Sequence, residues 1–189
     1  MFCFTRVKGI IFDLDDTLVH AKLDFAAMKQ EIACPHDDDI LEYINTLAPE
    51  KREEATKLVL MHELRDAENS RLIAGAKDFI ERAIEAGIPL AIVTRNCRRA
   101  TQRKLELNAI PIEHVLTRED ALPKPHPEAL LKISNDWQIP EARIAYIGDY
   151  KYDIEAAHNA GMQAWLFEYC SKNTQYEKAL RFIPAPLAQ

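Results

Sequence analysis

Short apolar runs alternate with longer amphipathic stretches along most of the chain. The runs are rich in β-branched residues, as expected of strands that are buried on both faces of a sheet. They cover residues 8–13, 88–93, 143–147 and 163–167, with a weaker run at 114–116. Between them, helical periodicity covers residues 74–86, 128–137 and 152–160. This alternation predicts an α/β fold, namely a doubly wound (Rossmann-like) parallel sheet with helices on both faces.

The stretch from about residue 20 to residue 71 breaks the alternation. Helical patterns occupy 25–32, 37–47 and 50–67, and no convincing strand is present. We therefore predict a small all-helical insertion after the first strand. The predicted division is an α/β core, residues 1–20 and 72–189, and a small helical unit, residues 21–71. The tail from Ser171, which contains two prolines, is expected to be a peripheral segment.

Composition and charge narrow the range of partners. The 189 residues include 24 Lys and Arg against 30 Asp and Glu, which gives a net charge of -6. Because no long basic run is present, we expect neither nucleic acid nor a membrane surface as the main partner. The longest apolar run, residues 87–93, is far shorter than the roughly 20 residues of a membrane-spanning helix. The four cysteines are widely spaced, which is typical of reduced thiols in a cytoplasmic protein.

Polar residues that could take part in catalysis or binding directly follow the predicted strands. In a doubly wound sheet, ligands bind beyond the carboxyl ends of the strands, so these residues are expected to converge. They are Asp13 and Asp15 after the first strand, Thr94, Arg95 and Asn96 after the second, Lys124 before the helix at 128, and Asp149 and Asp153 after the strand at 143–147.

The acidic residues among them predict a metal site. Clustered carboxylates repel one another unless they are protonated or share a cation. Oxygen ligands without nearby histidine or thiolate favour Mg²⁺ over Zn²⁺. A carboxylate beside such an ion can attack phosphorus as a nucleophile, and a second acid two residues on can exchange protons with the leaving oxygen and with water.

Four ordered motifs resemble those of the haloacid dehalogenase (HAD) superfamily, on its phosphoglycolate phosphatase-like branch. They are Asp13-x-Asp15-x-Thr17, Thr94, Lys124 before a proline, and Gly148-Asp149-x-x-x-Asp153. The resemblance covers the predicted core, and the helical insertion has the position of the family's cap. It implies that Asp13 is the nucleophile that becomes aspartyl phosphate. It also implies that Asp15 is the general acid and base.

The resemblance assigns the remaining residues to phosphate and metal. Thr94 and Lys124 would bind the phosphoryl group, and the neighbouring Arg95 and Asn96 are further candidates. Many family members have Asn directly after the Thr, whereas Arg95 intervenes here. Mg²⁺ would be held by Asp13, by the backbone carbonyl of Asp15, and by Asp149 and Asp153.

The function predicted on this basis is Mg²⁺-dependent hydrolysis of a small phosphorylated metabolite through an aspartyl-phosphate intermediate. A phosphomutase would keep the same four motifs. A dehalogenase would use the same nucleophile on carbon but would need neither a metal nor Asp15. A non-enzymatic receiver-type domain would carry its phospho-acceptor on a later strand.

Several of these residues also have purely structural interpretations. Asp16, Thr17 and Asp153 are residue types that cap helices, and Asp37 to Asp39 would complement a helix N-terminus. The sequence predicts neither the substrate nor the oligomeric state.

Overall fold

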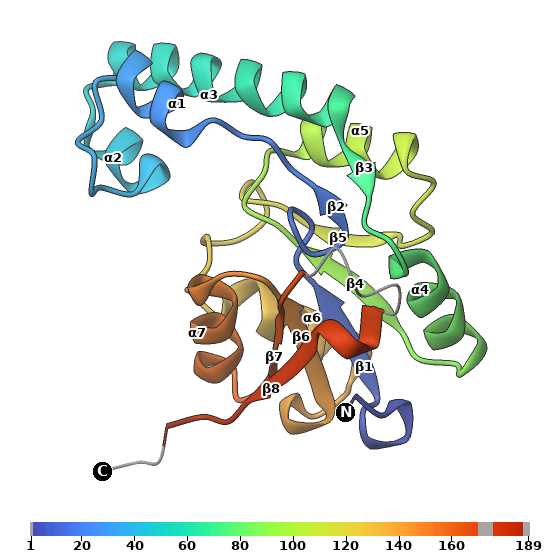
Figure 1. Cartoon of the computed structure of the whole chain (residues 1–189). Coiled ribbons are helices and arrows are strands. Elements are labelled where there is room, and N and C mark those ends of the chain that lie inside the picture. The colour runs from blue at the N-terminus through green and yellow to red at the C-terminus, as the bar shows by residue number, and fades with distance from the viewer. Residues whose placement is uncertain (1, 170–175, 187–189) are drawn as a thin grey trace.

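The computed structural model describes residues 2–169 and 176–186, which contain a six-stranded sheet with helices on both faces (Figure 1). The strand order is β5-β4-β1-β6-β7-β8, in which the first five strands are parallel and β8 is antiparallel to β7. The strands are β1 (Gly9–Phe12), β4 (Leu90–Val93), β5 (His114–Leu116), β6 (Ile144–Gly148), β7 (Gln163–Phe167) and β8 (Leu180–Ile183). The predicted doubly wound fold is confirmed. The strand order reverses beside β1, which is where such sheets bind ligands.

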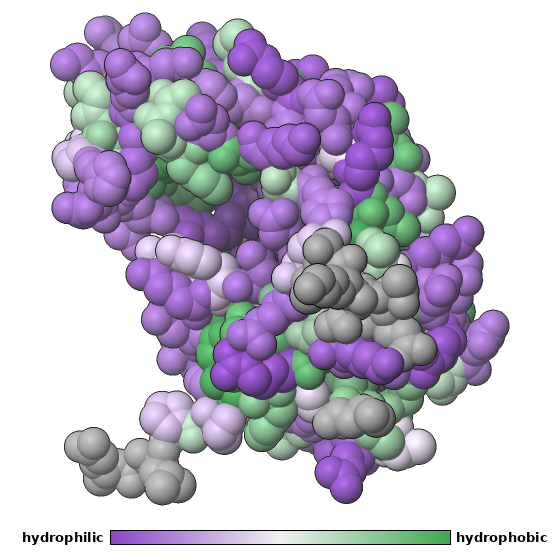
Figure 2. Space-filling model, viewed as in Figure 1, coloured by the Kyte–Doolittle hydropathy of each residue, from purple (hydrophilic) through white to green (hydrophobic). Residues whose placement is uncertain are grey.

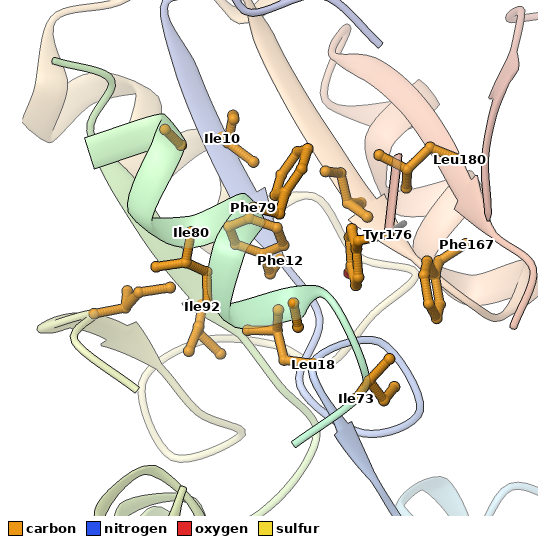
Figure 3. Close-up of a cluster of buried hydrophobic side chains, with 14 of the residues drawn as sticks. Ile10, Phe12, Leu18, Ile73, Phe79, Ile80, Ile92, Phe167, Tyr176 and Leu180 are labelled. Atoms are coloured by element: carbon orange, nitrogen blue, oxygen red, sulfur yellow. The ribbon is translucent and has the colours of Figure 1, made fainter. Parts of the chain in front are cut away.

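Alternate residues of β1 face opposite layers, because successive side chains of a strand point to opposite faces. The helices of the two layers are α4 (Ala76–Glu85) and α5 (Arg98–Leu107) on one face, and α6 (Glu128–Trp137) and α7 (Lys151–Asn159) on the other. Ile10 and Phe12 pack with Phe79 and other residues under α4 and α5, as Figure 3 shows in part, whereas Ile11 packs with Leu130 under α6 and α7. Both layers are therefore built on one central strand.

The helix α5 was not among the helices predicted from the sequence. Its buried residues include Thr101 and Lys104, so its inward face is partly polar and does not show as an apolar stripe. The partners of that face are side chains far away in sequence.

Three helices of the insertion lie beyond the carboxyl ends of the strands, at the top of Figure 1: α1 (Phe25–Glu31), α2 (Ile40–Thr46) and α3 (Pro49–Asn69). They enclose a small apolar cluster of their own, which includes Met28, Ile44 and Val59. The predicted helical insertion after the first strand is present, and its three helices lie close to the predicted ranges; its assignment as a cap domain stays a prediction. The helical pattern expected from residue 37 begins later, because Asp39 is the N-cap of α2 and its carboxylate accepts from Leu41 N and Glu42 N.

A short antiparallel pair joins the insertion to the core. Strands β2 (Val19–His20) and β3 (Arg71–Leu72) pair at both chain crossings. The expectation that the stretch from about residue 20 to residue 71 holds no strand is thus wrong at His20 and at Arg71. Two residues are too short a run to show an alternating pattern in sequence.

The tail after residue 175 forms part of the sheet, and the prediction of a peripheral segment is wrong for this part. Strand β8 extends the sheet beyond β7, and the buried Tyr176 stacks on Phe167 with ring centroids 4.4 Å apart. The Tyr176 hydroxyl donates to Thr17 O at 2.8 Å, which ties the tail to the loop after β1. Ser171 itself lies outside the described residues.

Within the described ranges, no helix combines the length and apolar character needed to cross a membrane. Cys3, Cys34 and Cys97 carry free thiols there, as expected, while Cys170 lies outside those ranges.

Candidate active site

A cavity of about 610 Å³ lies between the carboxyl edge of the sheet and the insertion. In Figure 2 it is the hollow between the upper and lower parts of the molecule. The predicted site residues that line it are Asp13, Asp15, Thr94, Arg95, Asn96, Lys124, Asp149 and Asp153. The structure therefore brings all eight together. The insertion contributes apolar residues to the lining, such as Leu23, Phe25 and Met28, together with charged ones, namely Lys29, Glu63 and the acidic run at 37–39.

Lys124 is the charged centre of the floor of this cavity. Its Nζ donates to Asp13 Oδ1 at 2.5 Å, to Asp153 Oδ1 at 2.7 Å and to Val93 O at 3.2 Å. Burial raises the pKa of Asp13 well above its usual range, although the charge of Lys124 opposes this shift. Burial alone would lower the pKa of Lys124, but the two carboxylates outweigh it and raise that pKa. Lys124 is therefore an ammonium ion that orients the carboxylate of Asp13.

Asp153 has a structural as well as a chemical role. Its Oδ2 accepts from Tyr150 N at 3.0 Å, so it caps α7, while Oδ1 accepts from both Lys124 and the buried Tyr146 hydroxyl. A Cβ at Gly148 would lie 2.3 Å from Asp153 Cγ. Glycine at this position is what allows the strand end and Asp153 to approach so closely. Tyr146 was missed in the sequence because it looks like an ordinary strand residue.

Three carboxylates form a group that fits a metal ion. Asp13, Asp149 and Asp153 each offer an oxygen, and these oxygens lie within 4.8 Å of one another. Burial, reinforced by the charges of Asp153 and Asp16, raises the pKa of Asp149 to about 7. An all-oxygen donor set of this kind fits Mg²⁺. The carboxylate of Asp15 belongs to a different set of contacts, and the assignment of its backbone carbonyl to the metal stays a prediction.

Both oxygens of the Asp15 carboxylate are held. Oδ2 accepts from Asn96 Nδ2 at 2.8 Å, and Oδ1 accepts from Lys104 Nζ at 2.5 Å. Lys104 also pairs with Asp66 of α3. Lys104 and Asp66 had no local sequence signal, because they lie 38 positions apart on different elements.

The structural alternative, in which Asp16 and Thr17 cap a helix, is wrong because the chain passes from this turn into β2.

The three predicted phosphate ligands on the loop after β4 make contacts with different partners. The hydroxyl of the buried Thr94 accepts from Asn96 N at 3.2 Å. Arg95 donates from Nη2 to Asp39 Oδ2 at 2.6 Å, and its guanidinium lies 4.9 Å from the ring centroid of Tyr152. Arg95 therefore connects the core to the N-terminus of α2, and the side-chain amide of Asn96 donates to Asp15.

The parallel sheet with its carboxylates, buried lysine and helical insertion defines an α/β enzyme with a carboxylate-based site. Residues 10–167 match the family model of haloacid dehalogenase-like hydrolases, and the chain belongs to that family. The predicted resemblance and the prediction of an enzyme are confirmed, and the receiver-type alternative is wrong.

Individual relatives agree with this assignment. A haloacid dehalogenase-like hydrolase domain-containing protein of Arabidopsis thaliana is 27% identical over 83% of this chain and 69% of its own length. The phosphoglycolate phosphatase of Haemophilus influenzae is 30% identical over 83% of this chain and 84% of its own. A predicted phosphoglycolate phosphatase of Haemophilus somnus has a similar fold, with a TM-score of 0.66 at 22% identity over 84% of each chain.

Proposed function

We propose that the protein is a Mg²⁺-dependent phosphomonoester hydrolase that acts through an aspartyl phosphate on Asp13. The observation that carries this proposal is the contact of Asp13 with Lys124 within a group of three carboxylates at the floor of the cavity. Relatives named phosphoglycolate phosphatase support a phosphatase rather than another hydrolase. The carboxylate of Asp15, which also lines the cavity, argues against a dehalogenase.

The first step forms a bond between Asp13 and the phosphorus of the substrate. Lys124 holds Oδ1, so we assign the attack to Oδ2. As this bond forms, the bond from phosphorus to the leaving oxygen breaks, and the leaving oxygen takes a proton from Asp15. We assign phosphate binding to the hydroxyl of Thr94 and to the charge of Lys124, which both line the cavity; the three ammonium protons of Lys124 already have acceptors, so a direct bond to a phosphoryl oxygen would replace one of those contacts.

The second step returns the enzyme to its starting state. Asp15, now a carboxylate, takes a proton from a water molecule as the water oxygen attacks phosphorus. The bond between phosphorus and Asp13 breaks, which releases inorganic phosphate and restores both carboxyl groups. A Mg²⁺ ion held by Asp13, Asp149 and Asp153 would reduce the repulsion between these carboxylates and the phosphoryl oxygens.

We infer the substrate class from the cavity and its cap. We assign residues 1–20 and 72–189 to the core and residues 21–71 to the cap, whose mixed apolar and charged lining faces the acidic floor. A small phosphorylated metabolite would place its phosphate on the floor and its remaining part against this lining. A cytoplasmic location agrees with the free thiols among the described cysteines.

The cap is expected to act as a lid over the site, and its contacts indicate which part moves. Helix α3 is joined to the core by ion pairs from Glu63 to Arg118, from Asp66 to Lys104 and from Glu68 to Arg103. In the part of the chain that the structure describes, one ion pair, from the N-cap residue Asp39 to Arg95, joins α2 to the core. We therefore place the movement in α1 and α2.

A phosphatase screen tests this function. The protein is offered a panel of phosphomonoesters, including 2-phosphoglycolate, sugar phosphates and p-nitrophenyl phosphate, with Mg²⁺ or with EDTA. We expect phosphate release that needs Mg²⁺ and that is lost in Asp13→Asn. Full turnover after exhaustive chelation would contradict the metal, and turnover by Asp13→Asn would contradict the nucleophile.

A further inference from the structure

Lys104 is a fully buried cation that joins the core to the cap. Its side chain, on α5, has no solvent exposure, and its Nζ lies 2.5 Å from Asp15 Oδ1 and 2.7 Å from Asp66 Oδ2. A buried ammonium is stable only when it is paired with charges or hydrogen-bond acceptors. Of its two partners, Asp66 is itself buried, whereas the side chain of Asp15 is 21% exposed and lines the cavity.

The contacts of Asp15 leave its carboxylate little freedom to turn. Lys104 holds Oδ1 from α5, and Asn96 holds Oδ2 from the loop after β4. A proton donor must be held within hydrogen-bond reach of the leaving oxygen, and an error of about 1 Å in position can cost 100-fold in rate. Asn96 alone would fix one oxygen and leave the other free to rotate.

The second partner of Lys104, Asp66, lies beside both chain crossings between core and cap. Asp66 lies near the end of α3, shortly before β3, and its Oδ1 accepts from Lys22 N at 2.6 Å, just after β2. One ammonium therefore connects the carboxylate of Asp15 to the segments through which the cap is attached.

We propose that Lys104 is a positioning residue: shared between Asp15 and Asp66, it sets the orientation of the Asp15 carboxylate and links it to the two chain crossings between core and cap. The inference rests on the proposed function, in which Asp15 exchanges protons with the leaving oxygen and with water. A lysine that only stabilised the fold would affect all substrates alike. A lysine that positions the proton donor affects most those substrates whose leaving group needs a proton.

The test uses a double variant, Lys104→Met with Asp66→Asn. This pair removes the ammonium without leaving an unpaired charge on α3, and the amide oxygen of the introduced asparagine can still accept from Lys22 N. The matched control is Arg103→Met with Glu68→Gln, which removes a neighbouring ion pair between the same two helices, with contacts of 2.8 and 2.9 Å, that does not touch Asp15. Circular dichroism and thermal unfolding establish that each variant is folded.

The readout is kcat/KM for an alkyl phosphate and for p-nitrophenyl phosphate, since the second has a leaving group that needs little protonation. In the double variant we expect kcat/KM for the alkyl phosphate to fall about 10- to 100-fold, as part of the 10²–10⁴-fold contribution of a general acid. For p-nitrophenyl phosphate we expect a change within about 3-fold, and for the control no change in the ratio of the two. Equal losses for both substrates, or no loss, would overturn the proposal.

A crystal structure of the double variant separates this inference from the function on which it rests. Wild-type protein that hydrolyses no phosphomonoester would contradict the proposed function. The position of Asp15 would still decide the role of Lys104. We expect the Asp15 carboxylate to have rotated away from its wild-type position, and an unchanged position with both oxygens still ordered would overturn the proposal.

Discussion

Two buried tyrosine hydroxyls offer a measurement of how strongly the active-site charges are coupled to the fold. The hydroxyl of Tyr146 donates to the carboxylate of Asp153 at 3.0 Å, and that of Tyr176 donates to the neutral carbonyl of Thr17 at 2.8 Å. Burial raises the pKa of both phenols well above their usual range, so both remain protonated donors. A Tyr→Phe change at either position removes one hydroxyl and leaves the packed ring in place.

The expected losses differ because the acceptors differ in charge. A hydrogen bond to a charged group contributes about 1.5–3 kcal/mol to stability, against about 0.5–1.5 kcal/mol between neutral groups. Tyr146→Phe should therefore lower the free energy of unfolding by about 1 kcal/mol more than Tyr176→Phe does. The contact of the Tyr146 ring with Lys124, at 5.6 Å from Nζ to the ring centroid, is kept in Tyr146→Phe and does not enter the difference. For a chain of this length, each 1 kcal/mol corresponds to roughly 2–4 °C in Tm.

The assay is urea unfolding in EDTA at neutral pH, with both variants and wild type measured side by side. The Mg²⁺ concentration that gives half-maximal activity is a second readout, which should rise for Tyr146→Phe because Asp153 loses a donor that orients it. Tyr176→Phe serves as the control and should leave this concentration unchanged. A loss of stability in Tyr176→Phe that equals or exceeds that in Tyr146→Phe would refute the assignment of a charged acceptor to Tyr146.

Three further outcomes are expected. The folded-state pKa of Asp149 is raised to about 7, so without metal its contribution to the free energy of unfolding is fully present below about pH 4 and is lost as the pH rises through 7. In EDTA at pH 8, Asp149→Asn should therefore unfold at a higher urea concentration than wild type, and this difference should disappear toward pH 4. Asp13→Asn should form no covalent intermediate, whereas Asp15→Asn should accumulate labelled acyl phosphate from p-nitrophenyl phosphate, as measured by acid quenching and hydroxylamine release; equal labelling of Asp13→Asn and wild type would contradict the mechanism. Hydrogen exchange followed by mass spectrometry should show that vanadate with Mg²⁺ slows exchange in α1 and α2 more than in α3, and an equal effect on all three helices would contradict a lid confined to α1 and α2.

Much of the fold could be predicted because the central strands are buried on both faces. Residues such as Ile10, Ile11 and Phe12 form an uninterrupted apolar run, which is a strong local signal. The position of the candidate site followed in turn, since Asp13 and Asp149 stand directly after such runs. The short strands β2 and β3, by contrast, have no pattern of their own.

The parts that escaped prediction depend on contacts between distant positions. The buried face of helix α5 can be identified only once the ion pairs of Lys104 with Asp15 and Asp66 are known. In the sequence alone, a lysine at that position is typical of a solvent-exposed site. The tail shows the same limitation, since Tyr176 becomes a core residue only through Phe167 and the carbonyl of Thr17. Sequence periodicity reports whether a face is apolar, and it does not detect a buried face that is held by charge.

The balance of charge at the floor of the cavity gives a physical reason for a cation to bind before the phosphate. Three carboxylates are grouped there, from Asp13, Asp149 and Asp153, and the ammonium of Lys124 pairs with the first and the last of them. Without a metal, burial and the neighbouring carboxylates raise the pKa values of Asp13 and Asp149. A phosphate dianion approaching this floor would be repelled by the carboxylates. A divalent cation held by them would offset that repulsion and favour the ionised form of Asp13, so the same event that allows the anion to enter also favours the attacking oxygen.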